Sequence, residues 1–332
     1  MSTAHPTVVV VGTGSIGRRH LTNLVAMGAA PQVCSEHRPR PALEVAGQAL
    51  PVLAGFEAAL AGDADVVLLA NPSSLHAGYA RRALEAGKHV LIEKPVALDA
   101  DDLAPLLAAA AERPDQVVGV VQQLRFHPLV EHLRRAVRGH GVGQVVAVEA
   151  HQGEHVADYH PDEDFRTGYA ARAELGGGVL RTQNHLLDLC VDLLGLPDAV
   201  SAVVRSPGAL DLDVEDAATF VGTVGDVDLS GRVDFLARPR RFRIDVVGDE
   251  GRASWDYYRS TFEIVGRDEE QLVGESAAFD RDAMFRAVID DFFEAVRTGR
   301  APRCGLDDAA RTVRLIDAIR SAGATGRRVV LG

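Results

Sequence analysis

The feature that most constrains this chain is a short β-branched run with a glycine-rich turn directly behind it. The run Val8–Val11 is followed by Gly12-Thr13-Gly14-Ser15-Ile16-Gly17 and then by a helical pattern through Leu21 and Leu24. Strand, glycine turn and helix in this order form the context of a dinucleotide site, because the glycines allow close backbone approach and the helix N-terminus offers free N–H groups to a pyrophosphate. The alternative is a glycine turn that serves only helix–strand packing.

Apolar runs and helical patterns then alternate along the chain. Further apolar runs lie at 32–35, 65–70, 88–93 and 116–121, and helical patterns lie at 75–86 and 99–112. This alternation predicts an α/β fold with a doubly wound parallel sheet, a Rossmann domain. Because 332 residues exceed what one core usually holds, we expect two domains, 1–124 and 125–332, and allow the C-terminal helix to pack back on the first.

The end of the second apolar run bears on the choice of cofactor. Glu36 lies about where a carboxylate accepts the ribose hydroxyls of NAD, and its charge would repel the 2′-phosphate of NADP. His37, Arg38 and Arg40 follow immediately and could accommodate such a phosphate. NAD is therefore the expected cofactor, with NADP possible.

Lysine is rare in this chain. Only two of its 35 Lys and Arg residues are lysines, Lys88 and Lys94. The chain uses arginine for nearly all of its positive charge. An ammonium is a compact donor that a guanidinium does not replace, so a lysine retained in such a chain indicates a functional need. The alternative is that both lysines survived by chance on the surface. Lys94 ends the run 88–93 within Glu93-Lys94-Pro95, which places it at the carboxyl edge of the sheet, where open α/β folds bind ligands.

A turn after the run 65–70 lies beside the same crevice. It reads Asn71-Pro72-Ser73-Ser74-Leu75-His76 and leads into a helical pattern. His76 is either a catalytic group or a surface residue in the first helical turn.

The second half offers a His–Asp pair. Thr182 is expected to cap a helix that ends at Gly195, and on that helix His185 and Asp188 are three residues apart and share a face. Asp188 would then orient the imidazole of His185, which is the usual type of proton acceptor. The alternative is a buried structural pair that holds the helix to the sheet.

The segment 151–172 carries many charges and no helical period. Arg125 before it, and Arg166 and Arg172 within it, could bind a phosphate or carboxylate on a substrate, and surface ion pairs are the alternative for each. Its histidines His151, His155 and His160, with Glu154 and Asp158 nearby, do not have a spacing that converges on a metal, so no metal is expected.

Composition argues against several classes of function. A net charge of −12 speaks against general nucleic-acid binding. No apolar stretch approaches the roughly 20 residues of a membrane-spanning helix, and no secretory signal is recognisable. Three widely spaced cysteines give neither a disulfide framework nor a paired metal signature, so we expect a cytoplasmic protein.

Four motifs in fixed order resemble the Gfo/Idh/MocA family of nicotinamide-dependent sugar and polyol oxidoreductases. They are the glycine turn 12–17, the Asn71-Pro72 turn with His76, Glu93-Lys94-Pro95, and Gly176-Gly177-Gly178 leading to His185-Leu186-Leu187-Asp188. The resemblance runs from about residue 7 to near the C-terminus. It implies a second domain with a large, open, mainly antiparallel sheet, in which Lys94 bonds the reacting oxygen and His185 is the acid/base.

One position departs from the family pattern. Many members carry an Asp shortly before the His, where this chain has Thr182, which puts the proton relay in doubt. The stretch from Tyr159 to Arg166 and Tyr169 also resembles a branch linked to surface-sugar biosynthesis.

Apolar and alternating segments at 145–150, 199–204, 218–224, 231–236, 242–247 and 253–257 support a second sheet, with a hairpin turn at 248–251. Helical patterns at 283–297 and 307–321 close the chain. Helices cover one face of such a sheet and the other face needs cover, so a homodimer or homotetramer is expected.

The expected function is hydride transfer between a nicotinamide and a secondary alcohol or ketone of a sugar, polyol or sugar derivative. An NAD-recycling glycosidase or epimerase and a non-catalytic dinucleotide sensor are the alternatives. The expected catalytic residues are Lys94, His185 and Asp188; the cofactor residues are Gly12, Gly14, Ser15, Ile16, Gly17, Glu36, Arg38, Asn71, Pro72, His76, Glu93 and Lys94; the substrate residues are Lys94, Arg125, Arg166, Tyr169, Arg172, Thr182 and His185.

Overall fold

The computed structural model describes residues 5–35, 41–159, 161–267, 270–274 and 280–331. The chain divides into two compact units. The first contains residues 1–123 and 280–310, and the second contains 124–279 and 311–332. The chain therefore passes between the units at 123/124, 279/280 and 310/311, and each unit is built from two separate stretches of sequence.

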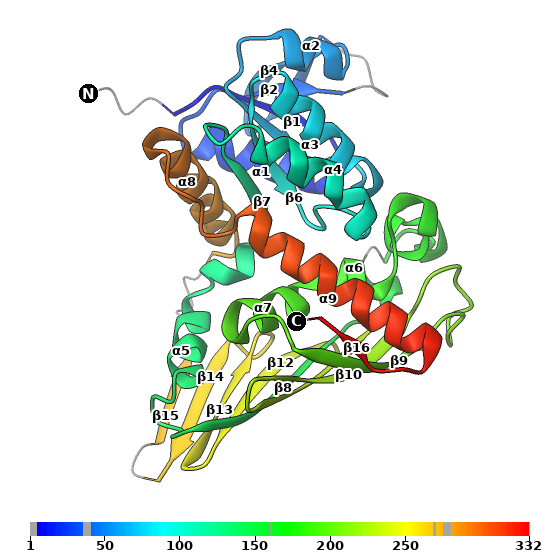
Figure 1. Cartoon of the computed structure of the whole chain (residues 1–332). Helices are drawn as coiled ribbons and strands as arrows, with labels where there is room; N and C mark the ends of the chain where they lie inside the picture. Colours follow the sequence, from blue (N-terminus) through cyan, green and yellow to red (C-terminus); the bar gives the residue numbers. More distant parts are fainter. Residues whose placement is uncertain (1–4, 36–40, 160, 268–269, 275–279, 332) are drawn as a thin grey trace. The chain divides into compact units, whose positions relative to one another are not determined.

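A mostly parallel sheet forms the centre of the first unit, in the strand order β3-β4-β2-β1-β5-β6-β7 (Figure 1). All neighbours pair in parallel except the hairpin β3–β4. The strands are β1 Val8–Val11, β2 Gln32–Cys34, β3 Ala42–Val45, β4 Gln48–Leu53, β5 Val66–Leu69, β6 His89–Glu93 and β7 Val118–Val121. Every residue of β1, β5 and β7 is buried, as expected for parallel strands covered on both faces.

The helices of the first unit are α1 Ser15–Ala26, α2 Phe56–Ala61, α3 His76–Glu85, α4 Ala100–Ala111, α8 Asp282–Thr298 and the start of α9 Leu306–Thr325, with a 3-10 turn, η1, at Ser73–Leu75. Asp99 caps α4 by accepting a hydrogen bond from the Asp102 N–H at 2.9 Å. Helix α8 packs against α1 and β7. A side chain at Gly119 of β7 would collide with the Phe292 ring of α8, so this strand and helix are fitted closely together.

The second unit is built on a mainly antiparallel sheet in the order β15-β14-β13-β12-β8-β11-β10-β9-β16, in which β8 and β11 are parallel (Figure 1). Its strands are β8 Val145–Gly153, β9 Ala199–Arg205, β10 Ala217–Val224, β11 Val227–Asp234, β12 Arg241–Gly248, β13 Gly251–Asp256, β14 Thr261–Gly266, β15 Glu270–Gly274 and β16 Val329–Val330. Its helices are α5 Pro128–Val137, α6 Val179–Thr182, α7 Asn184–Leu194 and the remainder of α9. Short 3-10 turns lie at Gln123–Phe126, Val156–Asp158, Phe165–Thr167, Tyr169–Ala171 and Ala173–Leu175 (η2 to η6).

Helices and core lie on one face of this second sheet. Helix α5 packs on β12, β13 and β14, α6 on β10 and β11, and α7 on β8. Ala150, Ile244, Trp255 and Phe262 occupy successive paired positions across four strands on this face and are buried.

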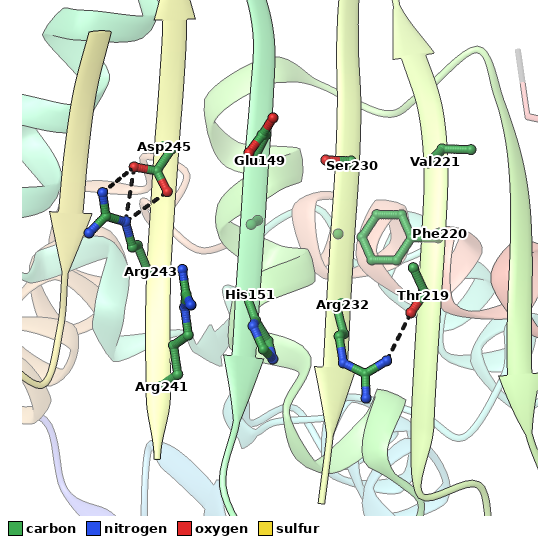
Figure 2. Close-up of a pocket in the computed structure, with 12 residues that line it drawn as sticks. Glu149, His151, Thr219, Phe220, Val221, Ser230, Arg232, Arg241, Arg243 and Asp245 are labelled. Carbon is green, nitrogen blue, oxygen red and sulfur yellow. Dashed lines mark hydrogen bonds and ion pairs between the residues drawn. The ribbon is translucent and has the colours of Figure 1, made fainter. Parts of the chain in front are cut away.

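The opposite face of the sheet is polar and hollowed. Figure 2 shows two neighbouring rows of side chains across its strands. Glu149 lies opposite Asp245 in one row, and His151 lies between Arg232 and Arg243 in the next, with Arg241 two residues before Arg243 on β12. Alternate side chains of an antiparallel strand point to opposite faces, so the polar positions on this face interleave with the buried ones on the other.

The fold confirms the expected α/β class, with a mostly parallel first sheet and a mainly antiparallel second sheet. Elements missing from the prediction are α2, α5, α6, the hairpin β3–β4 and the strands β14, β15 and β16. The predicted hairpin around residues 248–251 is confirmed by the antiparallel pairing of β12 and β13. Strand β11 begins at Val227, earlier than the sequence pattern indicated.

Candidate functional site

The glycine turn joins β1 to α1 and leaves its outer side open. Gly12 has φ +113°, and a Cβ there would lie 2.4 Å from the carbonyl oxygen of Ala70. A Cβ at Gly17 would lie 2.2 Å from the Gly12 oxygen, whereas one at Gly14 would meet nothing within 4 Å. The turn is therefore closed toward the sheet and open toward the N-terminus of α1, whose first turn holds no acidic residue.

This arrangement suits an anionic group such as a pyrophosphate, because the N–H groups at a helix start attract negative charge. Ser15 and Ile16 form the first residues of the helix at that opening. Glu36 and Arg38, which bear on NAD against NADP, lie outside the described residues.

Asn71 and His76 support the turn that follows β5. Within the described part of the chain, neither amide atom of Asn71 has a hydrogen-bond partner, although both atoms are buried. Its backbone nitrogen lies 3.0 Å from where a Cβ of Gly12 would be, so this unsatisfied amide is next to the glycine turn. Such an orphaned polar group fits a bound cofactor that would satisfy it. Pro72, which follows, is exposed.

His76 is the first residue of α3 and is 1 % exposed. Its Nδ1 lies 2.7 Å from the Pro95 carbonyl oxygen and its Nε2 lies 2.9 Å from the Asn71 carbonyl oxygen. Burial lowers the pKa of this imidazole, although the two carbonyl contacts oppose the shift. His76 thus joins the turns that follow β5 and β6, and the alternative of a surface histidine is wrong; its predicted contact with cofactor stays a prediction.

Lys94 is half-buried at the carboxyl end of β6. The preceding Glu93 is 6 % exposed, and one of its carboxylate oxygens accepts a hydrogen bond from the Lys94 backbone N–H at 3.1 Å. The other oxygen lies 2.7 Å from Nε2 of His20 on α1. The second lysine, Lys88, precedes β6 and donates from Nζ to the Gly62 carbonyl oxygen at 2.7 Å.

In the second unit a glycine turn introduces the helices α6 and α7. Gly178 has φ +105°, and a Cβ there would lie 2.5 Å from a carboxylate oxygen of Glu215. Glu215 is in turn bound by Arg320 at 3.0 and 2.9 Å. Thr182 is the last residue of α6 and Gln183 is the N-cap of α7, so the prediction that Thr182 caps the long helix is wrong.

His185 is the second residue of α7 and is half-buried. The two amide residues before it, Gln183 and Asn184, are both 2 % exposed. Gln183 donates to the Tyr159 hydroxyl at 3.0 Å and to the Asp234 carbonyl at 2.9 Å. Among the described residues, the side-chain oxygens of Gln183 and Asn184 have no hydrogen-bond partner. Sequence reasoning missed both residues, and their position directly before His185 was the available signal.

Asp188 is held by a guanidinium from outside its helix. Nε and Nη2 of Arg125 donate to its two oxygens at 2.9 and 2.7 Å, and both side chains are 2 % exposed. Arg125 also lies 3.3 Å from Asp192, which Arg134 binds at 2.6 Å. Arg125 therefore lies inside an ion-pair network, and its predicted contact with substrate, like the catalytic role of Asp188, stays a prediction.

Of the predicted substrate arginines of the loop, Arg166 is exposed and Arg172 is half-buried. Arg166 stacks on the Phe165 ring with its guanidinium carbon 4.5 Å from the ring centroid. Arg172 is paired with Glu174, and Tyr169 is 42 % exposed. These side chains are accessible to a ligand, and their roles stay predictions.

The histidines weighed as metal ligands have other partners. His151 Nε2 lies 3.0 Å from a carboxylate oxygen of Asp234. Burial acts to raise the pKa of Asp234, but hydrogen bonds from His151 and the Leu236 N–H and the charge of Arg232 hold it at about 2. His155 accepts from the Ala157 N–H at 3.3 Å. His160 lies outside the described residues.

Within the described part of the chain, no helix is both long and apolar enough to cross a membrane. Cys34, Cys190 and Cys304 are buried and form no disulfide with one another, and burial raises the pKa of Cys190 to about 12.

Two family models match this chain. Residues 7–121 match the model of the oxidoreductase family with an NAD-binding Rossmann fold, and residues 130–254 match the GFO/IDH/MocA C-terminal domain. The UDP-N-acetylglucosamine 3-dehydrogenase of Acidithiobacillus ferrooxidans is 30 % identical over 316 residues, which cover 90 % of this chain and 91 % of that protein. A D-xylose 1-dehydrogenase (NADP(+)) of Haloferax volcanii is 25 % identical over 97 % of this chain and 98 % of its own length.

Solved structures agree with this. The UDP-N-acetylglucosamine 3-dehydrogenase of A. ferrooxidans superimposes with a TM-score of 0.80 at 26 % identity, covering 98 % of this chain and 100 % of that chain. A levoglucosan dehydrogenase, solved with NADH and levoglucosan, reaches a TM-score of 0.87 at 19 % identity over 98 % of this chain and 99 % of its own, which shows the shared fold. With both models and a near-full-length relative in agreement, the chain belongs to the Gfo/Idh/MocA oxidoreductase family.

Proposed function

We propose that this protein is a nicotinamide-dependent dehydrogenase that acts on a secondary hydroxyl of a sugar or sugar derivative. The observation that carries the proposal is the placement of Lys94. This half-buried ammonium lies at the carboxyl end of β6, in a turn that His76 ties to Asn71 and thus to the open glycine turn. Ligands bind at this edge in open α/β sheets.

The first unit supplies cofactor binding and charge stabilisation. The N–H groups at the start of α1 would hold the pyrophosphate, and the Asn71 amide would contact the cofactor. A bound nicotinamide supplies the acceptor for a hydride from the carbinol carbon. Lys94 would donate a hydrogen bond to the hydroxyl oxygen, and its positive charge would stabilise the negative charge that develops there.

The second unit supplies the base. A ring nitrogen of His185 would take the hydroxyl proton as the hydride leaves, so that the alcohol loses one proton and one hydride to become a ketone. Asp188 would act by anchoring α7, because Arg125 engages both of its oxygens. This assigns Asp188 a positioning role in place of direct contact with substrate.

The substrate is inferred from the relatives. A nucleotide sugar is the first choice, since the 30 % identical relative is named for UDP-N-acetylglucosamine and matches over nearly its whole length. The guanidinium groups of Arg166, which is exposed, and Arg172, which is half-buried, are paired with Asp164 and Glu174 and are of a type suited to a diphosphate. A free sugar or polyol is the second choice. NAD is expected ahead of NADP because of the carboxylate at Glu36.

The test is reduction of NAD or NADP by the purified full-length protein across UDP-N-acetylglucosamine, inositol, D-xylose and levoglucosan. Lys94→Met should lower kcat by at least about 10²–10³-fold, the cost of removing one donor to a developing oxyanion. Lys88→Arg is the matched control, because it changes the other lysine and retains a donor toward Gly62. Lys94→Arg asks whether an ammonium is required.

The outcomes separate the candidate functions. Turnover that survives Lys94→Met would exclude the assigned role of that residue. Product formed from a tightly held NAD without accumulating NADH would indicate a recycling glycosidase or epimerase. NAD binding with no reaction, and no change on His185→Ala, would indicate a sensor.

A second copy of this chain is the proposed cover for the open face of the second sheet. The acidic row of Glu149 and Asp245 lies beside the basic row of His151, Arg232 and Arg243, in which Arg243 binds Asp245 of the same chain (Figure 2). A two-fold axis across the strands would set the basic row of each copy against the acidic row of the other, and such a patch is self-complementary.

Sedimentation tests this assembly. The wild type should sediment as a dimer or larger, and Arg232→Glu with Arg241→Glu should shift it toward the monomer. Arg297→Glu, a single charge reversal at an exposed site on α8, is the control. A monomeric wild type would refute the proposed assembly.

A further inference from the structure

A histidine behind the glycine turn is completely buried and has no part in the mechanism above. His20 is 0 % exposed on the inward face of α1, with its ring edge against the Phe285 ring at 5.7 Å between centroids. Its Nε2 lies 2.7 Å from a carboxylate oxygen of Glu93. It therefore connects the helix that carries the glycine turn to the strand that carries Lys94.

The direction of this hydrogen bond follows from the two groups. A carboxylate can only accept, so the proton lies on Nε2 of His20. Nδ1 of His20 is buried and has no hydrogen-bond partner among the described residues. A proton on Nδ1 would be a buried donor without an acceptor, which is costly, so the imidazole with its single proton on Nε2 is the form that this environment satisfies best.

Glu93 also binds the backbone of Lys94, so it links His20 to that residue. Its other oxygen accepts the Lys94 N–H at 3.1 Å. On the far side of Lys94, the carbonyl of Pro95 is bound by His76 at 2.7 Å. Hydrogen bonds therefore hold the backbone on both sides of Lys94. On its N-terminal side His20 acts through Glu93, and on its C-terminal side His76 contacts the Pro95 carbonyl.

We propose that His20 is a positioning residue for Lys94 and acts through the carboxylate of Glu93. It has no exposed surface and touches neither substrate nor cofactor. It fixes the position of the Lys94 backbone, and it links that backbone to helix α1, which follows the glycine turn. Its effect on rate depends on the proposed dehydrogenase function, whereas its effect on the environment of Lys94 does not.

The rarity of lysine allows a direct test without substrate. Reductive methylation of the full-length protein with ¹³C-formaldehyde labels Lys88, Lys94 and the N-terminal amine, and Lys88→Arg assigns the signals in an NMR spectrum. Lys88 lies at the other end of β6 and donates to Gly62, so it reports whether a change is general. A purely structural histidine in the core would move both lysine signals or neither.

Three variants define the expected result. His20→Leu should shift or broaden the Lys94 signal and leave the Lys88 signal in place. His20→Gln, whose amide can still donate to Glu93, should restore the wild-type spectrum. Glu93→Gln should disturb the Lys94 signal as His20→Leu does, and it keeps the proposal testable if His20→Leu does not fold as judged by circular dichroism.

Kinetics give the second readout. His20→Leu should lower kcat by roughly 10–100-fold, the range for loss of a hydrogen bond to a charged group, with KM for the sugar and Kd for the cofactor little changed. The double variant His20→Leu with Glu93→Gln should be no slower than Glu93→Gln alone, because both changes break one chain of contacts.

A folded His20→Leu protein with an unmoved Lys94 signal would overturn the proposal, and so would additive losses in the double variant. If no sugar is oxidised by the wild type, the proposed function fails while the NMR result still decides the role of His20. A Lys94 signal that moves in His20→Leu and returns in His20→Gln supports the positioning role in either case.

Discussion

Two buried carboxylates lie next to the residues assigned to the reaction, and they are held in different ways. Glu93, before Lys94, is bound by one imidazole and one backbone N–H. Asp188, on the helix of His185, is bound by two nitrogens of the Arg125 guanidinium, and that guanidinium also reaches Asp192. One carboxylate holds a turn through single hydrogen bonds, and the other belongs to a network of full charges.

The two carboxylates are therefore expected to have different roles, one in the stability of the second unit and the other in the positioning of Lys94. Removing one member of a buried ion-pair network leaves an unpaired charge in the core, which is expensive for the whole unit. Removing one hydrogen bond at a turn costs little in stability but lets the backbone move. We expect the Asp188 network to determine whether the second unit folds and the Glu93 contacts to determine how well Lys94 works.

The largest expected effect is on stability, from Arg125→Met. It should destabilise the second unit by about 3–5 kcal/mol, because Asp188 remains buried without its guanidinium, whereas Asp192 keeps Arg134. Urea unfolding followed by the fluorescence of Trp255, the sole tryptophan and a buried residue of β13, measures this. Adding Asp188→Leu should recover part of the loss.

Arg238→Met is the matched control for that prediction. Arg238 binds Asp158 with the same two-point geometry, 3.0 and 2.7 Å, but both side chains are about half exposed. Solvent screens such a pair, so its loss should be far smaller. Equal losses from the two variants would remove the distinction between network and surface pair.

Acid should affect the two regions differently. The pKa of His76 is lowered by burial, so the folded protein binds fewer protons there than the unfolded chain does. The stabilising contribution is complete above pH 6.5 and declines as pH falls through the lowered folded pKa, by at most about 1.4 kcal/mol per pH unit. Hydrogen exchange of the peptides around residues 71–97 should rise on acidification before Trp255 emission changes.

His76→Asn isolates this contribution, since the amide keeps a donor but does not titrate. The variant should lose stability more gradually than the wild type as pH falls from neutral. Parallel curves for the two proteins would show that other groups cause the acid response.

Glu93→Gln tests the other carboxylate of this comparison by its effect on the free energy of unfolding. The amide oxygen can replace only one of the two acceptors, so the stability loss should be about 1 kcal/mol, well below that of Arg125→Met. Denaturant unfolding followed by circular dichroism measures it. A loss as large as that of Arg125→Met would mean that Glu93 is a core element like Asp188.

The smallest stability effect is expected from Asn71→Ala. Its amide has no partner within the described chain, so unfolding should change by less than about 0.5 kcal/mol. Cofactor affinity should nevertheless fall by roughly tenfold, the value of one hydrogen bond, in a titration of NADH fluorescence. An unchanged affinity would exclude the assigned contact between Asn71 and the cofactor.

Sequence reasoning succeeded where a motif is local. The glycine turn and Lys94 at the end of β6 follow from residues adjacent in the chain, because a buried parallel strand is a short apolar run whose end can be seen directly. The hairpin β3–β4 was missed because its strands Ala42–Val45 and Gln48–Leu53 are short and lack a β-branched run.

It failed where the partner is distant in sequence. The spacing of His185 and Asp188 placed them on one helix face, yet spacing cannot show that Arg125, 63 positions away, binds both oxygens of Asp188. Thr182 fits a helix cap by type, but the short helix α6 ends there and Gln183 intervenes. His20 carried no signal, since its partner Glu93 is 73 residues further along the chain.

The division of each unit into two stretches has a consequence for synthesis on the ribosome. The first unit is not complete until residues 280–310 have emerged, because α8 supplies Phe285 against His20 and Phe292 against Gly119. The second unit waits for its last strand, Val329–Val330. The glycine turn is therefore translated first, yet its helix acquires its packing partner only after most of the second sheet has been made.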